Sequence, residues 1–473
     1  MARIVVVGGG VAGLGAAMLL AGDGHQVTVL ERDAAEPPAD PAGAWDAWER
    51  PGLNQFRLPH AFLSGFCRVV DAELPEVARA AEAAGALRQN YITDILPASA
   101  TGGWQPGDER FGWLTGRRAF MEAVLAASAE MAHGVRIRRG VSVAGLVSDG
   151  AAAPGVPLVT GVRTRDGEVI AADLVADATG RRSALPGWLA EIGATAPAEE
   201  AEDSGFVYYG RHFRSADGSV PAMFGPGVMD WGTISSLTLP ADNGTWAVGL
   251  VTASRDPALR SLREPARWEA VVRSLPLAAH WLDGQPIEDG VRVMARLEDR
   301  YRGFMPGGSP VAAGVVAVAD SWACSNPTHG RGASIGMLHA VVLRDLLRAD
   351  GHDDPAAFAR NFHAATAATV EPWYRATLAE DRHRLAEIEA GIGGAGYDPP
   401  DPAFQRYREL EAAARQDPGC LRGYLDIRLV LRTPDEVFAD PVLRERSAAL
   451  GASWRDAPRL GPDRAALLAL AAG

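Results

Sequence analysis

The sequence contains no lysine, so all 46 basic residues among its 473 are arginine. This absence excludes a pyridoxal Schiff base, the phosphate-binding lysine of a P-loop and any catalytic lysine. Cysteine is also scarce, with only Cys67, Cys324 and Cys420. Three widely separated cysteines form neither a disulfide framework nor a C-x-x-C metal site, so we expect no metal and a reducing, cytoplasmic location.

Positive charge is in deficit, because 59 acidic residues outnumber the 46 arginines and give a net charge of -13. A duplex-binding protein needs a basic face, so we expect no nucleic-acid partner. The 47% of hydrophobic residues exclude a disordered chain and allow two or three cores. Residues 4–22 are uncharged over a membrane-spanning length, but their glycines favour a strand, a turn and a helix, so we expect no membrane span.

The first residues have the pattern of a dinucleotide-binding turn. An apolar run at residues 4–7, typical of a buried parallel strand, leads directly into Gly8-x-Gly10-x-x-Gly13 and a helical stretch. Gly8 allows the tight turn, Gly10 lets the backbone approach a pyrophosphate, and Gly13 lets the helix lie close to the strand. The free N–H groups of the helix would face the phosphates. The alternative is a glycine-rich turn that binds no ligand.

A second predicted strand, residues 26–30, ends in Glu31. An acidic residue about 20 positions after the glycines binds a ribose hydroxyl in such sites. Its carboxylate would repel a 2′-phosphate, so FAD or NAD is favoured over NADP. A second G-x-G-x-x-G at residues 391–396 follows a charged helical stretch and no strand. We interpret it as the end of a helix and a loop.

Two further motifs follow the same scheme of an apolar strand and a polar turn. Residues 173–176 lead into Asp177-Ala-Thr-Gly180, and residues 311–318 lead into Asp320. Shortly afterwards the segment Pro327-Thr-His-Gly-Arg-Gly-Ala-Ser334 precedes an apolar-periodic helix. The positive end of that helix would stabilise negative charge on a group bound before it.

With these three motifs, over residues 1–350, the chain resembles the FAD-dependent monooxygenase superfamily of the p-hydroxybenzoate hydroxylase type. Its motifs are most similar to the halogenase-like and epoxidase-like branch. The resemblance implies an α/β fold: a Rossmann-type, three-motif FAD-binding domain with an interleaved antiparallel β-sheet substrate domain and a helical C-terminal region. The implied parts are an FAD-binding segment at 1–185, with a loop at 40–110 toward the active site, a middle sheet at 186–300, a returning FAD-binding segment at 301–352 and helices at 353–473.

The resemblance also implies which residues bind FAD. Arg118 matches an FAD-contacting arginine at a helix start, with Arg117 as a register alternative. The implied set is Gly8, Gly10, Val11, Ala12, Gly13, Glu31, Arg32, Arg118, Val143, Asp177, Gly180, Asp320, Pro327, Gly330, Gly332, Ala333 and Ser334. Asp177-Ala-Thr-Gly180 departs from the Asp-Gly of aromatic hydroxylases, which leaves open whether the chain itself binds NADPH. Flavin halogenases need a catalytic lysine, so we reject halogenation.

Aromatic residues of the middle segment suggest a lipophilic or aromatic substrate, and we predict that Tyr208, Phe224, Trp231 and Trp322 bind it. Ordinary sheet core is the alternative for each. The polar, proline-bounded segment 48–60 would run near the flavin or form a surface loop. From it and the third motif come three candidate catalytic residues: Arg57, His60 and His329. A backbone-capping role is the alternative for His329.

The expected function is an FAD-dependent monooxygenase that hydroxylates or epoxidises a lipophilic or aromatic small molecule, a biosynthetic intermediate, with O₂ through a flavin C4a-hydroperoxide. Electrons would come from NAD(P)H or from a separate flavin reductase. The alternatives are a flavin-dependent reductase or dehydrogenase on the same fold and a non-redox cyclase that keeps FAD as a structural element. The helical tail would cover the flavin domain, shape the substrate entrance or form a dimer surface.

Overall fold

A five-stranded parallel sheet forms the base of the protein in a computed structural model, which describes residues 1–53, 55–456 and 460–473. Its strand order is β18 (Val315–Ala317), β9 (Leu174–Asp177), β1 (Arg3–Val7), β2 (Gln26–Glu31) and β5 (Val135–Arg139). All neighbouring strands pair in parallel. The strand, glycine turn and second strand predicted at the N-terminus are confirmed. β18 lies far from β9 in the sequence but pairs directly with it in this sheet.

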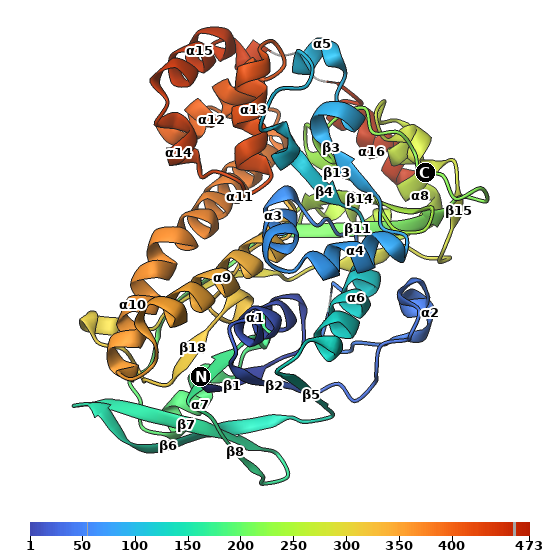
Figure 1. Cartoon of the computed structure of the whole chain (residues 1–473). Coiled ribbons are helices and arrows are strands. Elements are labelled where there is room, and N and C mark those ends of the chain that lie inside the picture. The colour runs from blue at the N-terminus through green and yellow to red at the C-terminus, as the bar shows by residue number, and fades with distance from the viewer. Residues whose placement is uncertain (54, 457–459) are drawn as a thin grey trace.

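Three helices pack on this sheet: α1 (Val11–Gly22), α6 (Arg118–Met131) and α9 (Gly332–Asp350). α1 contacts both α6 and α9, and Figure 1 shows it between them. An antiparallel sheet of β6 (Val143–Ala153), β7 (Val156–Thr164) and β8 (Val169–Ala171) extends along the lower edge of the molecule in Figure 1. The short helix α7 (Leu185–Glu191) follows the second motif.

A largely antiparallel sheet lies above the parallel one, as the resemblance implies. It contains β12 (Val228–Trp231), β13 (Ile234–Pro240), β14 (Thr245–Ala253), β11 (Phe206–Arg214), β15 (Gln285–Pro286) and β16 (Arg292–Met294). Every residue of β13 and β14 is buried, so both faces of these strands are covered. α8 (Pro265–Arg273) packs through Trp268, whose indole donates to the Tyr209 carbonyl oxygen at 2.9 Å.

A smaller sheet connects the middle region with the returning segment. β17 (Glu298–Gly303) pairs with β10 (Ala198–Asp203) on one side and with β19 (Ala323–Cys324) on the other. The domain boundary predicted at residue 300 therefore lies inside β17. The division into domains stays a prediction.

The segment between β2 and α6 is mostly short elements that cover the region between the two main sheets. They are α2 (Ala44–Ala47), α3 (Ser64–Glu73), α4 (Pro75–Ala83), β3 (Arg88–Asn90), a π-helical turn (Tyr91–Ile95), α5 (Ala98–Thr101) and β4 (Gly112–Leu114). β3 and β4 pair antiparallel. A bridge between Phe62 and Leu114 joins this pair to the segment before α3.

The C-terminal region is helical, and its helices pack in three different places. They are α10 (Pro355–Thr369), α11 (Glu371–Ile392), α12 (Pro402–Ala413), α13 (Pro418–Arg428), α14 (Pro434–Phe438), α15 (Pro441–Gly451) and α16 (Arg464–Ala472). α10 packs on α9, α12 to α15 form a cluster reached through the long α11, and α16 packs on α8 (Figure 1). α11 ends at Ile392 before Gly394 with φ +75°, which confirms the predicted helix end. Among the described helices, none combines the length and apolarity needed to cross a membrane.

Candidate active site

A cavity of about 480 Å³ opens at the carboxyl ends of β1, β9 and β18 and continues below the middle sheet. Ligands of open α/β sheets bind at this edge. Its volume lies in the usual range of cofactor and substrate sites. Most of the predicted FAD-binding residues line it: Gly8, Gly10, Val11, Ala12, Glu31, Arg32, Arg118, Val143, Gly180, Asp320, Pro327, Gly330, Gly332 and Ala333.

The glycine turn after β1 leaves room for a ligand only where the sequence pattern predicts it. Gly8 has φ +107°, and a Cβ there would lie 2.6 Å from the Ala178 carbonyl oxygen. A Cβ at Gly13 would lie 2.0 Å from the Gly8 carbonyl oxygen, so this glycine keeps α1 close to the strand and does not line the cavity. Gly10 faces open space, because no atom lies within 4 Å of its ideal Cβ. This is the shape of a pyrophosphate cradle.

Two helices begin at the cavity wall without a side-chain cap. Gly10 precedes α1 and Arg331 precedes α9, and neither first turn contains an acidic residue. Uncapped backbone N–H groups and the positive end of the helix dipole favour an anionic ligand. The amides of α1 fit a pyrophosphate, and those of α9 fit the electron-rich edge of a flavin ring. The residues present therefore fit FAD.

The Glu31 carboxylate lies at the cavity wall and is fixed from three sides. It accepts hydrogen bonds from the amides of Gly9 and Asp33, both at 2.9 Å, and from the Arg50 guanidinium at 2.7 Å. Arg50 also pairs with Asp33 and Glu122, both at 2.9 Å, and is 5% exposed. Sequence analysis missed Arg50. The only signal was its position in the polar segment 48–60.

Arg117 and Arg118 point in different directions. Arg118 lines the cavity and donates to Glu122 at 2.7 Å and to the Gln55 side chain at 3.3 Å. Arg117 is buried away from the cavity, where its guanidinium binds the Asp242 carboxylate at 2.5 Å. Of the two registers, the structure therefore brings Arg118 to the site.

Two predicted FAD-binding side chains lie behind the cavity wall. The buried Asp177 carboxylate accepts hydrogen bonds from the Thr179 amide at 3.0 Å and from the Thr179 and Ser183 hydroxyls. It holds the turn that presents Gly180. The Ser334 side chain is enclosed in the first turn of α9 and does not line the cavity.

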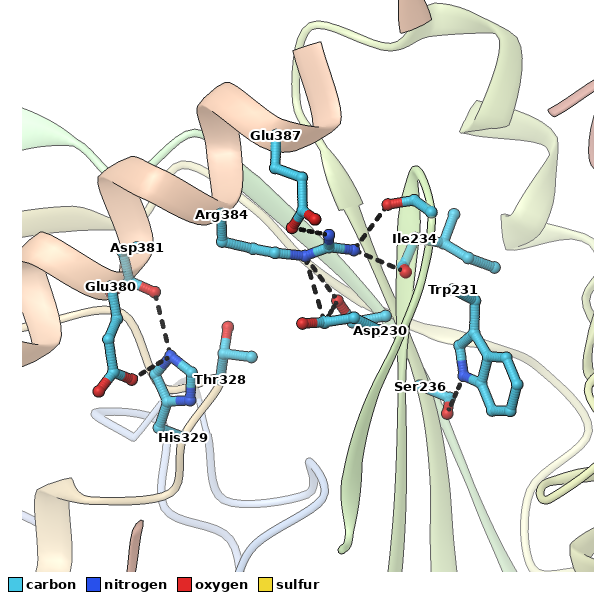
Figure 2. A network of polar contacts seen from close by, with 12 residues as sticks. Asp230, Trp231, Ile234, Ser236, Thr328, His329, Glu380, Asp381, Arg384 and Glu387 are labelled. Atoms are coloured by element: carbon cyan, nitrogen blue, oxygen red, sulfur yellow. Dashed lines mark hydrogen bonds and ion pairs between the residues drawn. The ribbon is translucent and has the colours of Figure 1, made fainter. Parts of the chain in front are cut away.

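The four predicted substrate-binding aromatics divide into two pairs. Tyr208 and Trp322 line the cavity, but Phe224 and Trp231 do not, which corrects the prediction for these two. Phe224 is 63% exposed and lies against the His280 ring. Trp231 is buried in the sheet, and its indole N–H donates to the Ser236 hydroxyl at 2.7 Å (Figure 2). Trp231 therefore belongs to the core of the sheet, which is the alternative that the sequence left open for it.

The two predicted catalytic residues of segment 48–60, His60 and Arg57, differ in whether they line the cavity. His60 lines the cavity, and its buried Nε2 has no hydrogen-bond partner among the described residues. Burial, with a contribution from the Arg118 charge, lowers the pKa of His60 to about 3, so the ring is neutral. Arg57 does not line the cavity. It pairs instead with Glu49 at 2.7 Å and with the Trp48 carbonyl oxygen, which corrects its proposed role.

His329 lines the cavity and belongs to a buried ionic network (Figure 2). Its Nδ1 accepts a hydrogen bond from the Arg428 guanidinium at 2.7 Å, and its Nε2 lies 3.3 Å from the Glu380 carboxylate. Burial and the charge of Arg428 hold the pKa of His329 well below its ordinary value. The ring is therefore neutral, with its proton on Nε2 facing Glu380. It is not a backbone-capping histidine.

A second polar chain runs from the cavity toward α11. The Tyr208 hydroxyl contacts Asn326 and Thr328, and the side-chain amide of Asn326 donates to Asp381 at 2.9 Å. Burial raises the pKa of Asp381 well above its ordinary value, and the nearby Asp299 adds to this shift. This shift favours the protonated form of Asp381. Burial likewise keeps Tyr208 neutral by raising its pKa.

The C-terminal helices complete the wall of the cavity. Tyr374 of α11 contributes, together with residues of α13 and the position after it: Tyr424, Leu425, Arg428 and Leu429. The opposite wall is apolar and includes Leu58, Leu237, Leu239, Met294 and Leu297. Of the roles left open for the tail, the structure shows that it shapes the cavity. No sequence motif indicated which of its helices would do so.

Solved structures with the same fold include two proteins of different function. A Diels-Alderase, PyrE3 of pyrroindomycin biosynthesis, matches with a TM-score of 0.56 and 18% identity over 92% of this chain and 80% of its own. PqsL of Pseudomonas aeruginosa, a probable FAD-dependent monooxygenase, matches with a TM-score of 0.55 and 17% identity over 82% of this chain and 99% of its own. At these identities the likeness shows the fold alone.

The sequence of the nucleotide-binding segment adds the decisive observation. Residues 3–94 match the family model described as FAD dependent oxidoreductase. This segment therefore resembles FAD-dependent oxidoreductases. A curated relative of the chain, Protein Rv3254 of Mycobacterium tuberculosis, is 28% identical over 394 residues, which cover 78% of this chain and 77% of the relative.

Proposed function

We propose that the protein is a monooxygenase that inserts one atom of O₂ into a lipophilic small molecule, as a hydroxyl or an epoxide. The observation that carries this proposal is the continuity of the cavity, which leads from the glycine cradle past α9 into an apolar chamber below the middle sheet. When bound, FAD supplies the two-electron chemistry that activates O₂ for transfer of one oxygen atom. The electrons come from NAD(P)H or from a separate reductase.

The chain's contribution to FAD binding is assigned by position. The amides after Gly10 hold the pyrophosphate, Glu31 and Arg32 hold the adenosine ribose, and Val143 contacts the adenine. Asp320 would bind the ribityl chain, and the amides at the start of α9 would bind the flavin ring. These helix amides stabilise negative charge on the ring without reorganisation, because their orientation is fixed by the fold.

The remaining walls position the substrate and exclude water. Leu237, Leu239 and Leu297 present apolar surface, and the neutral Tyr208 hydroxyl is a polar group of the same cavity. His60 and His329 are neutral, so neither carries a proton that it could release near pH 7. The chemistry then depends on orientation and on a dry cavity rather than on a side-chain acid.

The test is oxygen incorporation by the purified, FAD-loaded protein. Dithionite-reduced protein is mixed with ¹⁸O₂ and a panel of lipophilic alkenes and phenols, and products are analysed by mass spectrometry. A monooxygenase gives products that carry one ¹⁸O atom. The proposal would be contradicted if the flavin reoxidised with hydrogen peroxide as the only product for every member of the panel. This result would have to hold with NAD(P)H and with a separate reductase as well as with dithionite.

A non-redox cyclase is the second candidate, because the Diels-Alderase PyrE3 has the same fold. The discriminating measurement is the dependence of turnover on the oxidation state of the flavin. A monooxygenase consumes one NAD(P)H, that is two electrons, per product and stops without O₂. A cyclase forms an isomer of its substrate at the same rate with oxidised flavin under nitrogen.

A further inference from the structure

Arg428 is a cation at the cavity wall whose hydrogen-bonding capacity is only partly used. It is the last residue of α13, and its side chain is 15% exposed. One terminal nitrogen donates to His329 Nδ1 at 2.7 Å and lies 3.7 Å from the Glu380 carboxylate. Among the described residues, no acceptor binds its Nε or its other terminal nitrogen, and neither atom is fully enclosed. These donors are available to a molecule in the cavity.

The surrounding charges do not balance that of Arg428. Glu380 is the carboxylate nearest to it, and the other oxygen of Glu380 already pairs with Arg331 at 2.9 Å. Two guanidinium groups therefore share one carboxylate. His329 is neutral and supplies no compensating charge, and burial shifts Asp381 toward its protonated form.

The next carboxylate is also engaged elsewhere, because Glu411 pairs with Arg408 at 2.8 Å. The phenols of Tyr407 and Tyr424 beside Arg428 stay neutral, since burial raises the pKa of each. A buried cation that only partly uses its hydrogen-bonding capacity gains from an anionic ligand that binds its remaining donors.

The end of α13, which carries Arg428, is also held in place before any ligand binds, and His329 binds the guanidinium. The Leu429 carbonyl oxygen accepts a hydrogen bond from the Gly65 amide at 2.8 Å, which joins the end of α13 to α3. Arg110 pairs with Asp426 of α13 at 2.9 Å. A cation fixed in this way binds an oxygen anion without losing the freedom of its own side chain.

We propose that Arg428 binds an anionic oxygen, a carboxylate or an ionised phenol or enol, on an otherwise apolar substrate. The inference deepens the proposed function and rests on it, because it takes the chamber beside Arg428 to be the substrate site. Arg428 would orient one end of the molecule, while Leu425 and Leu429 contact its apolar body. An electron-rich portion of the substrate would then lie toward the flavin.

The test compares two probes of similar shape and different charge, 2-naphthoate and 2-naphthamide. Each is titrated into the FAD-loaded protein, and binding is followed by the perturbation of the flavin absorbance. We expect the wild-type protein to bind naphthoate about 10- to 100-fold more tightly, as for a charge-assisted hydrogen bond. Arg428→Met should abolish this preference, and Arg428→Lys should keep part of it.

Arg432→Met is the matched control, because Arg432 is half-exposed at the end of the same segment and does not line the cavity. It should bind both probes as the wild type does. A wild-type protein without a preference for the carboxylate, through equal binding or through no binding, overturns the proposal. A preference that survives in Arg428→Met overturns it as well.

Two further measurements separate the alternatives. The affinity of Arg428→Met for FAD should equal that of the wild type; a loss of FAD affinity with an intact carboxylate preference would assign the guanidinium to the flavin instead. In the wild type, affinity for 4-nitrophenol should rise as its hydroxyl ionises with pH, and a fall would contradict the proposal even if the Met variant does not fold. Because no turnover is measured, a carboxylate preference without ¹⁸O incorporation would contradict the monooxygenase proposal alone.

Discussion

The Asp242 carboxylate binds both the backbone amide of Arg117, at 2.8 Å, and its guanidinium, at 2.5 Å. Asp242 lies in the turn between β13 and β14, and Arg117 directly precedes α6, so the contact joins the middle sheet to the nucleotide-binding part. Both side chains are buried. The adjacent Arg118 faces the cavity, and two successive arginines thus have separable roles.

Asp242→Ala and Arg118→Met should therefore affect different properties. The first should lower the stability of the protein, and the second should weaken FAD binding. Asp242→Ala leaves a buried guanidinium without its partner and should lower the free energy of unfolding by about 3–5 kcal/mol. Arg118→Met should change stability much less, because Glu122 keeps its pairing with Arg50, and should weaken FAD binding about tenfold. Denaturant unfolding and fluorescence titration of the apoprotein with FAD measure the two quantities. Equal loss of FAD affinity in both variants, with both folded, would refute this division.

Alanine substitutions at two glycines of the same motif should affect different properties, stability in one case and FAD affinity in the other. Gly13→Ala places a Cβ 2.0 Å from the Gly8 carbonyl oxygen and should separate α1 from β1, with a loss of several kcal/mol of stability. Gly10→Ala meets no protein atom within 4 Å, so the apoprotein should keep its melting temperature. Its methyl group occupies space beside the proposed pyrophosphate, and FAD affinity should fall. Normal FAD binding by Gly10→Ala would remove the pyrophosphate from this position.

Glu31 should matter for FAD affinity as well as for folding. Glu31→Ala removes the proposed ribose hydrogen bonds, while Arg50 keeps Asp33 and Glu122 as partners. We expect FAD to dissociate about 10- to 100-fold more readily, with a loss of stability of roughly 1–3 kcal/mol. Glu31→Gln is the control that keeps the size of the side chain. Unchanged flavin occupancy in Glu31→Ala after gel filtration would place the ribose elsewhere.

Asp299 should produce a pH-dependent loss of stability. Burial raises the pKa of Asp299 to about 6, although the hydrogen bond from the backbone amide of Asn326 acts to lower it. In the unfolded chain the same carboxyl ionises near 3.8. Between these values the folded chain holds a proton that the unfolded chain has released. The stability contributed by the protonated carboxyl is therefore complete below pH 4 and lost as the pH rises through 6, by about 3 kcal/mol in total.

Asp299→Asn cannot ionise and supplies the reference for this measurement. The difference in unfolding free energy between wild type and variant, measured by denaturant titration at several pH values, should fall from pH 4 to 6 and stay level above pH 7. A flat difference would mean that the carboxyl is ionised throughout this range in the folded protein.

The parts of the fold that depend on local pattern could be predicted from the sequence. The strand at residues 4–7, the glycine turn and Glu31 are close in the chain, and their physics is contained in about 30 residues. The third motif was also predictable, because an apolar strand and a helix flank its polar turn. Local pattern likewise predicted the end of α11, where glycines follow a charged helix.

The rest of the site depends on contacts between distant segments. Arg428 reaches His329 across 99 positions, and no periodicity indicates which tail helix borders the cavity. Trp231 and Phe224 have the composition of a substrate site, but the pairing of β12 with β13 buries the first in the sheet and the loop before β12 exposes the second. Composition suggested an aromatic site without indicating which aromatics face it.

The closure of the cavity by α13 also determines when the site comes into being during synthesis. The glycine cradle leaves the ribosome well before the wall that carries Leu425, Arg428 and Leu429, which follows some 400 residues later. Until then, the apolar chamber of the nascent chain lacks one side, and a flavin bound there would remain in contact with water. The nucleotide-binding part of the site is made before its tail wall, and a compartment able to separate reactants from solvent exists only after α13 has been synthesised and has packed.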